Sequence, residues 1–142
     1  MGRILAIDYG KKRTGIAVTD PLQLIASGLT TVETRGLWKF VQDYVALETV
    51  DIIVVGEPKQ MNYTDSELGP VIHAFVDKLK IAYPQLKVER VDERFTSKMA
   101  FQTMIDSGLS KGKRKNKALV DEIAATIILQ SYLQRNTFFD IE

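Results

Sequence analysis

The hydrophobic and polar positions of the chain first predict a three-stranded meander. An unbroken apolar run, residues 4–7, ends on the carboxylate of Asp8, as expected for a strand buried on both faces. Gly10 and Gly15 bracket a short basic turn, and a second apolar run returns from it as a hairpin partner. Residues 24–33 predict a third strand beside the second.

After the meander, helical and strand patterns alternate. Apolar positions at helical spacing predict helices over residues 36–48, 70–83, 96–107 and 117–134, and apolar runs predict strands over 51–55 and 86–91. A meander followed by such alternation is typical of an α/β protein with a mixed five-stranded sheet flanked by helices. No repeat or linker interrupts the pattern, so we expect a single domain over residues 1–136 and a loose tail over 137–142.

Composition narrows the classes of function. No apolar run approaches the length of a membrane span, so we expect no membrane association and a cytoplasmic location. The chain has no Cys, which excludes disulfides, a thiolate nucleophile and a Cys-ligated metal. His73 is the only histidine and lies beside an apolar stripe, so we interpret it as structural. The formal net charge is +1, so affinity for nucleic acid must come from a local patch.

Carboxylates stand where the predicted sheet ends. Asp8 ends the first strand, Asp92 and Glu93 end the last, and Asp121 and Glu122 lie near the start of the final helix. Convergent carboxylates repel one another unless a cation neutralises them, and hard oxygen ligands favour Mg²⁺ or Mn²⁺. Two such ions suit displacement at phosphorus. Two alternatives stay open, because first-turn acids favoured by the helix dipole and a solvated strand end would give the same pattern.

A basic run precedes the final helix. It places five positive charges in seven residues: Lys111, Lys113, Arg114, Lys115 and Lys117. Such a run can contact phosphates, or it can be a solvated loop.

Several motifs, in order along the chain, resemble those of the YqgF/RuvX family. The first is Asp8-Tyr9-Gly10 with Arg13, Gly15, Ala17 and Asp20. The others are Val54-Val55-Gly56 with Pro58 and Met61, then Asp92-Glu93-Arg94-Phe95-Thr96-Ser97, then Lys117 with Asp121, Ala124, Ala125, Ile128, Leu129, Gln130, Tyr132 and Leu133. The resemblance spans about residues 3 to 134.

The resemblance implies a ribonuclease H-like fold and an acidic site. Asp8, Glu93 and Asp121 would be the catalytic metal ligands, with Asp8 central and Glu93 favoured over Asp92. It also implies phosphate contacts, which would come from Arg13, Lys59 and Arg94 and from the basic run. The sequence departs from the family pattern at Glu57, where Leu is typical, and this carboxylate is a candidate extra acid of the metal site.

These features predict a metal-dependent nuclease acting on structured nucleic acid. The family implies two substrates, the 5′ leader of pre-16S rRNA, which we favour, and a Holliday junction in DNA. A non-catalytic RNA-binding factor in ribosome assembly is the alternative from another class. The apolar residues expected to be exposed, Phe138 and Phe139, are too few for a standard interface, so we expect a monomer, with a dimer as the alternative.

Overall fold

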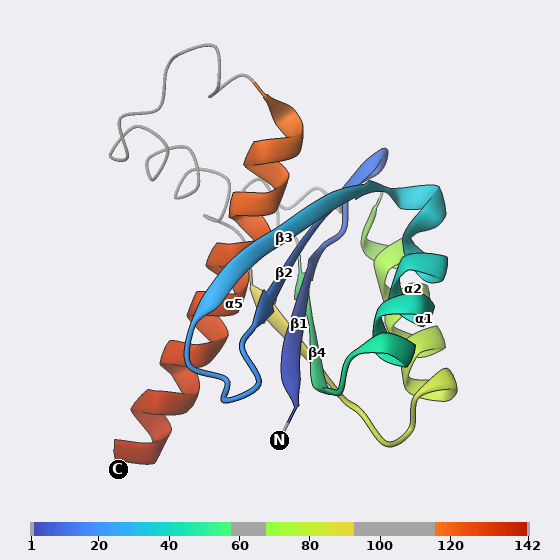
Figure 1. The fold of residues 1–142 in the computed structure, drawn as a ribbon. Helices are drawn as coiled ribbons and strands as arrows, with labels where there is room; N and C mark the ends of the chain where they lie inside the picture. The colour runs from blue at the N-terminus through green and yellow to red at the C-terminus, as the bar shows by residue number, and fades with distance from the viewer. Residues whose placement is uncertain (1, 58–67, 93–115, 142) are drawn as a thin grey trace.

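The computed structural model of the chain describes residues 2–57, 68–92 and 116–141 (Figure 1). Its elements are β1 (Arg3–Asp8), β2 (Arg13–Thr19), β3 (Ala26–Glu33), the short 3-10 helix η1 (Thr34–Gly36), α1 (Leu37–Leu47), β4 (Val50–Glu57), α2 (Leu68–Ala82), β5 (Lys87–Asp92) and α5 (Lys117–Ile141). The helix expected over residues 96–107 lies outside the described residues.

The five strands form one mixed sheet in the order β3-β2-β1-β4-β5, which confirms the predicted fold class. The β1–β2 and β2–β3 pairs are antiparallel, whereas β1–β4 and β4–β5 are parallel. The carboxyl ends of β1, β4 and β5 therefore meet at one end of the sheet, which we call the carboxyl end. Asp8, Glu57 and Asp92 are the last residues of these strands.

Helices cover the two faces of the sheet differently. Helices α1 and α2 lie on one face and α5 lies on the other (Figure 1). Side chains of a strand alternate between faces, so Leu5 and Ile7 pack with the first pair of helices while Ile4 and Ala6 pack with α5. The α5 side is built with small residues, including Ala17 and Ala125. This helix therefore lies close to the sheet.

Helix α5 runs further than the sequence predicted. We expected it to end near residue 134 with a loose tail beyond, but the helix continues through Ile141. Residues 134–141 contain neither Gly nor Pro, so neither of the two strongest helix-stopping residues interrupts the last turns.

The start of β3 also differs from the expectation. The strand begins at Ala26 instead of residue 24, because Asp20 organises the preceding residues into a loop. Its carboxylate accepts hydrogen bonds from the main-chain N–H groups of Leu22, Leu24 and Ile25, at 3.1, 2.9 and 2.8 Å. These donors are thereby taken away from strand pairing.

None of the helices in the three described ranges is long and apolar enough to cross a membrane.

Candidate nucleic-acid site

Asp8 and Asp121 are brought to the same face of the sheet by a glycine. Asp8 lies two residues after Ala6 in β1, so the two side chains belong to the same face of the sheet. Ala6 packs against α5, so this is the α5 face. In the β1–β2 pair, Asp8 lies opposite Gly15. A Cβ atom on Gly15 would lie 2.0 Å from the main-chain oxygen of Asp121, so only glycine lets α5 approach β2 this closely. One residue thus links the end of β1 to the second turn of α5.

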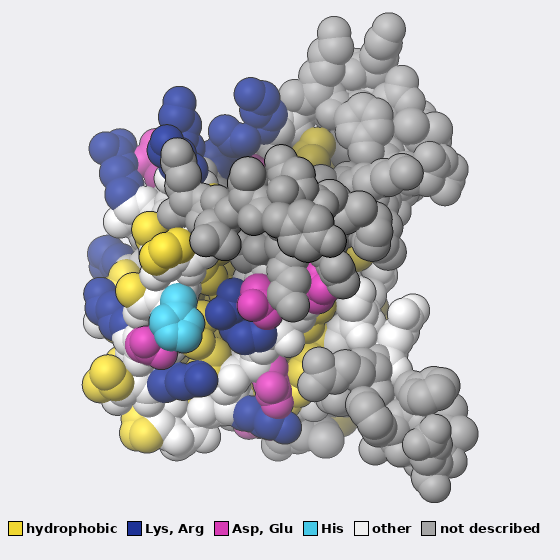
Figure 2. All heavy atoms as spheres, turned by 180° about the vertical axis from the view of Figure 1, so that it is seen from behind, with side chains coloured by type: hydrophobic (Ala, Val, Ile, Leu, Met, Phe, Trp, Pro, Cys, Tyr) yellow, Lys and Arg dark blue, Asp and Glu magenta, His cyan; other side chains and the backbone are white. Residues whose placement is uncertain are grey.

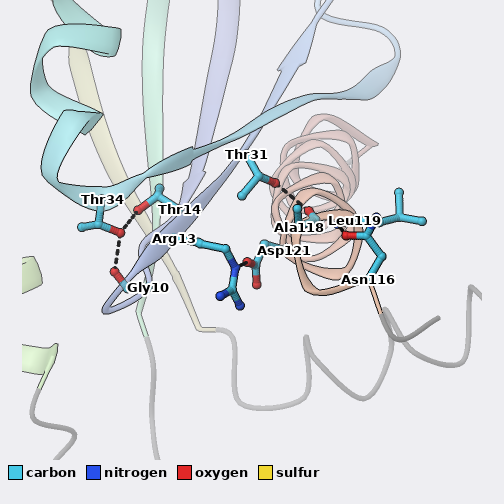
Figure 3. A network of polar contacts seen from close by, with 9 residues as sticks. All are labelled: Gly10, Arg13, Thr14, Thr31, Thr34, Asn116, Ala118, Leu119 and Asp121. Carbon is cyan, nitrogen blue, oxygen red and sulfur yellow. Dashed lines mark hydrogen bonds and ion pairs between the residues drawn. The ribbon is translucent and has the colours of Figure 1, made fainter. Parts of the chain in front are cut away.

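The start of α5 fixes the position of Asp121. Asn116 caps the helix, since its Oδ1 accepts the N–H of Leu119 at 3.2 Å. Thr31 of β3 donates its hydroxyl to the carbonyl of Ala118 at 2.6 Å, which ties the first turn to the sheet (Figure 3). The first turn contains no acidic residue, so the interpretation of Asp121 and Glu122 as first-turn acids is wrong. Asp121 comes one turn later and faces β2.

Arg13 contacts the acid directly. Its Nε donates to Asp121 Oδ2 at 2.9 Å, and the side chains remain 38% and 24% exposed, respectively (Figure 3). The sequence predicted that Arg13 binds phosphate. The structure adds that its guanidinium pairs with one of the two carboxylates, and the predicted phosphate contact stays a prediction.

The turn between β1 and β2 is held by Thr34. Its hydroxyl donates to the carbonyl of Gly10 at 2.7 Å (Figure 3). Its N–H donates to the carbonyl of Lys12 at 2.9 Å. The buried Thr14 hydroxyl lies 2.8 Å from the Thr34 hydroxyl. Because Thr34 already donates to Gly10, Thr14 is the donor in that bond. These bonds place the turn against the end of β3.

A pocket of about 380 Å³ lies beside this turn, and we call it the basic pocket. Its lining residues are Lys11, Lys12, Arg13, Glu33 and Arg35. Arg35 Nε pairs with Glu33 Oε2 at 2.7 Å, so four cations surround one carboxylate. Sequence reasoning noted the basic turn but assigned no role to Lys11, Lys12 or Arg35. The cations between Gly10 and Gly15 were the available signal, whereas Arg35 joins them only through the fold.

Two other carboxylates at the carboxyl end belong to the opposite face. Glu57 and Asp92 are paired across β4 and β5. Glu57 lies two residues after Val55, and Asp92 lies four residues after Val88, so each acid shares a face of the sheet with its valine. Both valines pack on the α1 and α2 side. The acids of the sheet end therefore divide between its faces, and Glu57 does not join Asp8 and Asp121 on the α5 face.

Several predicted site residues cannot be placed. Seven of them lie outside the described residues: Lys59, Glu93, Arg94, Lys111, Lys113, Arg114 and Lys115. Lys117 is the first residue of α5 and is exposed. Within ranges 2–57, 68–92 and 116–141, no group of three His, Cys, Asp or Glu side chains is arranged to hold a metal ion. His73 is 73% exposed on α2, with Nε2 3.6 Å from the carboxylate of Asp77.

Relatives at high identity cover nearly the whole chain. A protein of Flavobacterium johnsoniae, named "Putative pre-16S rRNA nuclease", is 62% identical over 138 residues, which are 97% of this chain and 100% of that protein. A protein of Bacteroides thetaiotaomicron with the same name is 60% identical, again over 97% of this chain and 100% of its own.

Solved structures share the fold at low identity. A structure of Thermus thermophilus RuvC in complex with a Holliday junction substrate has a TM-score of 0.58 and 18% identity, covering 96% of both chains. A second structure of Thermus thermophilus RuvC has a TM-score of 0.55 and 17% identity, covering 95% of this chain and 96% of its own. The family described as "RuvX: Holliday junction resolvase" matches residues 2–135. The chain therefore belongs to the RuvX family, as the sequence motifs indicated.

Proposed function

We propose that this protein is a metal-dependent nuclease that hydrolyses phosphodiester bonds in structured nucleic acid, and that it processes the 5′ end of pre-16S rRNA. The observation that carries the proposal is that Gly15 lies opposite Asp8 in the sheet and directly against Asp121 of α5, beside a pocket lined by four cations. The names of the close relatives support the choice of RNA substrate.

The residues on the α5 face fit a divalent cation. Asp8 and Asp121 offer carboxylate oxygens, the ligand type that Mg²⁺ and Mn²⁺ prefer. The family resemblance adds Glu93 as the third carboxylate. The alternation of β5 supports this choice over Asp92, because Asp92 belongs to the face covered by α1 and α2. When bound, two such cations would activate a water molecule and neutralise the leaving oxygen of the phosphodiester.

The Lys and Arg side chains of the basic pocket have a role separate from that of the metal ions. The turn of Lys11 and Lys12, fixed by Thr34, and Arg35 from η1 give a positively charged surface beside the two acids. Phosphate contacts of this kind position a substrate without reading its sequence. Arg13 connects the basic pocket with the acids, because its guanidinium lines the pocket and pairs with Asp121. It can therefore orient both the carboxylate and a neighbouring phosphate. We assign the same phosphate-binding role to Lys59, Arg94 and the basic run.

The second candidate function is resolution of Holliday junctions, which the description of the family favours. Resolution requires paired cuts on opposing strands and hence two active sites related by a two-fold axis. We predict a monomer, which would cut singly. The structure adds exposed apolar residues that this prediction did not include: Leu22, Leu24 and Ile25, all more than 60% exposed in the loop before β3. The close relatives are bacterial proteins named for pre-16S rRNA, and we propose that this protein acts in the cytoplasm.

A cleavage assay with paired variants tests the proposal. The parent, Asp8→Asn and Asp92→Asn are incubated with an RNA carrying the 5′ leader of 16S rRNA and with a synthetic four-way DNA junction, in Mg²⁺, Mn²⁺ or chelator. We expect metal-dependent cleavage of the RNA by the parent and a loss of about 100-fold or more in Asp8→Asn. RNA affinity should stay within a few-fold, because phosphate contacts lie elsewhere. Asp92→Asn is the matched control and should cleave like the parent.

A thermal-shift measurement gives a second readout. Mg²⁺ should raise the melting temperature of the parent and of Asp92→Asn more than that of Asp8→Asn, because a ligand stabilises the state that binds it. Equal cleavage by parent and Asp8→Asn, in preparations free of contaminating nuclease, would reject the metal site at Asp8. RNA binding without cleavage by the parent would favour the RNA-binding factor. Symmetric paired nicks in the junction by a stable dimer would favour the resolvase.

A further inference from the structure

A second pocket, whose lining includes three aromatic side chains, lies on the face of the sheet away from α5. It has a volume of about 280 Å³, and we call it the aromatic pocket. Tyr9, Trp38 and Phe75 supply its rings, and Val71, Arg35 and Lys78 are among its other lining residues. The ring centroids of Tyr9 and Phe75 are 5.4 Å apart, and those of Trp38 and Phe75 are 6.2 Å apart with an edge-on geometry. The three rings thus form one continuous cluster.

The cluster is not sealed in the core. Tyr9, Trp38 and Phe75 pack against the buried residues of this face but each stays partly exposed, and Val71 is 48% exposed. Lys78 places its Nζ 4.0 Å from the centroid of the Trp38 ring. Partly exposed aromatic rings accompanied by cations are the kind of surface on which proteins stack unpaired bases.

The aromatic pocket is next to the basic pocket. Arg35 lines both, and Tyr9 is separated from Lys11 only by Gly10. Thr34 also lines the aromatic pocket while it holds the β1–β2 turn, so the two pockets share one rigid connection. Figure 2 shows Lys and Arg side chains gathered along the upper edge of the molecule, where this turn lies, with exposed hydrophobic side chains below them.

Both pockets surround the end of β1 that carries Asp8. Tyr9 directly follows Asp8, and its ring packs with the core on the α1 and α2 side, while Asp8 belongs to the α5 face. A strand of nucleic acid whose backbone occupies the basic pocket would therefore have the acids on one side and the aromatic rings on the other.

We propose that the aromatic pocket binds an unpaired base of single-stranded RNA, and that the basic pocket binds the phosphates next to that base. This proposal rests on the proposed function, whose site it extends. The charge and the chemistry of the two pockets are complementary to one flipped-out nucleotide and its backbone. A base held in a duplex has its faces covered by its neighbours and cannot enter. The surface therefore selects a single-stranded segment beside the bond to be cut.

Trp38 is the only tryptophan of the chain, so tryptophan fluorescence reports on this pocket. The full chain is titrated in chelator, where no cleavage occurs, with a ten-nucleotide single-stranded RNA, with the same RNA in a blunt duplex, and with the single-stranded DNA of the same sequence. We expect the single-stranded RNA to quench the emission of Trp38 with saturation and the duplex to leave it nearly unchanged. Fluorescence anisotropy of a labelled RNA gives the affinity independently.

Charge variants test which surface the RNA occupies. Lys78→Gln and Arg35→Gln remove exposed cations from the rim of the aromatic pocket, and each should weaken the affinity for single-stranded RNA about twofold to fivefold. Lys80→Gln is the matched control, since Lys80 is exposed on the same helix and lies about 200° around its axis from Lys78. The control should bind like the parent.

The outcomes separate this inference from the proposed function. The pocket is supported if single-stranded RNA quenches the emission of Trp38 and if Lys78→Gln and Arg35→Gln weaken this binding. This holds even in a protein that fails to cleave. Equal quenching by the duplex, quenching only by DNA, or variants that match Lys80→Gln would overturn it, even if the leader RNA is cleaved.

Discussion

The two ends of the sheet use their carboxylates in different ways. At the end where β1 begins, Asp20 accepts three main-chain N–H groups, and Asp51 Oδ2 accepts the N–H of Gly2 at 2.7 Å and the Nε2 of Gln23 at 3.3 Å. These acids fasten loops and the first strand. At the carboxyl end, Asp121 pairs with a partly exposed guanidinium and lies on the same face as Asp8.

This difference gives a criterion that separates a stabilising acid from a candidate functional acid in this fold. A carboxylate that binds the backbone has its charge committed to the folded chain, and losing it costs stability. A carboxylate that faces a side-chain cation or another carboxylate can exchange that partner for a ligand. Substitutions at the first end should thus change stability and leave activity, and those at the carboxyl end should do the reverse unless they move the backbone.

The largest expected effect comes from moving the backbone at the carboxyl end. Gly15→Ala would put a Cβ 2.0 Å from the main-chain oxygen of Asp121, so α5 must shift away from β2. We expect a loss of about 3 kcal/mol in the free energy of unfolding, measured by urea denaturation, and cleavage reduced about 100-fold. Gly36→Ala is the control, since a Cβ there meets nothing within 4 Å, and it should change stability by less than about 1 kcal/mol. Parent-like stability of Gly15→Ala would contradict the close approach.

A smaller effect is expected from the ion pair. In Arg13→Gln, Asp121 loses the cation that competes with a metal ion, so the affinity for Mg²⁺, measured by calorimetry, should rise about twofold to fivefold, as expected for a partly exposed pair. The affinity for RNA should fall, because a cation of the basic pocket is lost. Lys39→Gln, a surface lysine paired with Asp43 on α1, is the control for both. Weaker Mg²⁺ binding by Arg13→Gln would show that the arginine supports the metal site instead of competing with it.

The smallest effect tests the opposite end. The hydrogen bond from the Ile25 N–H, with those from Leu24 and Leu22, holds the pKa of Asp20 below its ordinary value of 3.8 despite partial desolvation. A lowered pKa in the folded state means that the carboxylate stabilises the protein above the unfolded pKa, and that this stability is lost as the pH falls through the folded pKa.

Asp20→Asn should therefore unfold at lower urea than the parent at pH 7, and the gap should close below about pH 4. Cleavage at pH 7 should be unchanged. Asp43→Asn, a surface acid of α1 that contacts Lys39, is the comparison for a loss of charge alone. If the difference in stability persists undiminished at low pH, Asn at this position destabilises the protein for reasons other than the loss of the carboxylate charge.

Much of the sheet was predictable because local sequence determines it. The strand signals are the apolar runs before Asp8 and Glu57, and the hairpin signal is the pair of glycines around the basic turn. The order of these elements along the chain requires a mixed sheet. The ends of elements were less predictable, because they depend on side-chain to main-chain bonds. Asp20 moves the start of β3, and Asn116 fixes the start of α5.

The candidate site was predictable in its residue types and less so in its partners. Asp8 and Asp121 were identified from strand and helix ends and from the family motifs, but their common face depends on the close approach of Gly15 to α5. The pairing of Arg13 with Asp121 joins residues 108 positions apart, which no local pattern encodes. The aromatic pocket combines the end of β1 with α1 and α2, and each of its rings alone looks like an ordinary core residue.

The separation of Asp8 and Asp121 along the chain has a consequence for synthesis. Asp8 ends the first strand, and Asp121 belongs to α5, the last described helix. Because a nascent chain emerges from its N-terminus, the five strands are made before α5. The two carboxylates therefore cannot share a face of the sheet until α5 has been made. A cation site built from both carboxylates would form only when α5 docks onto the sheet.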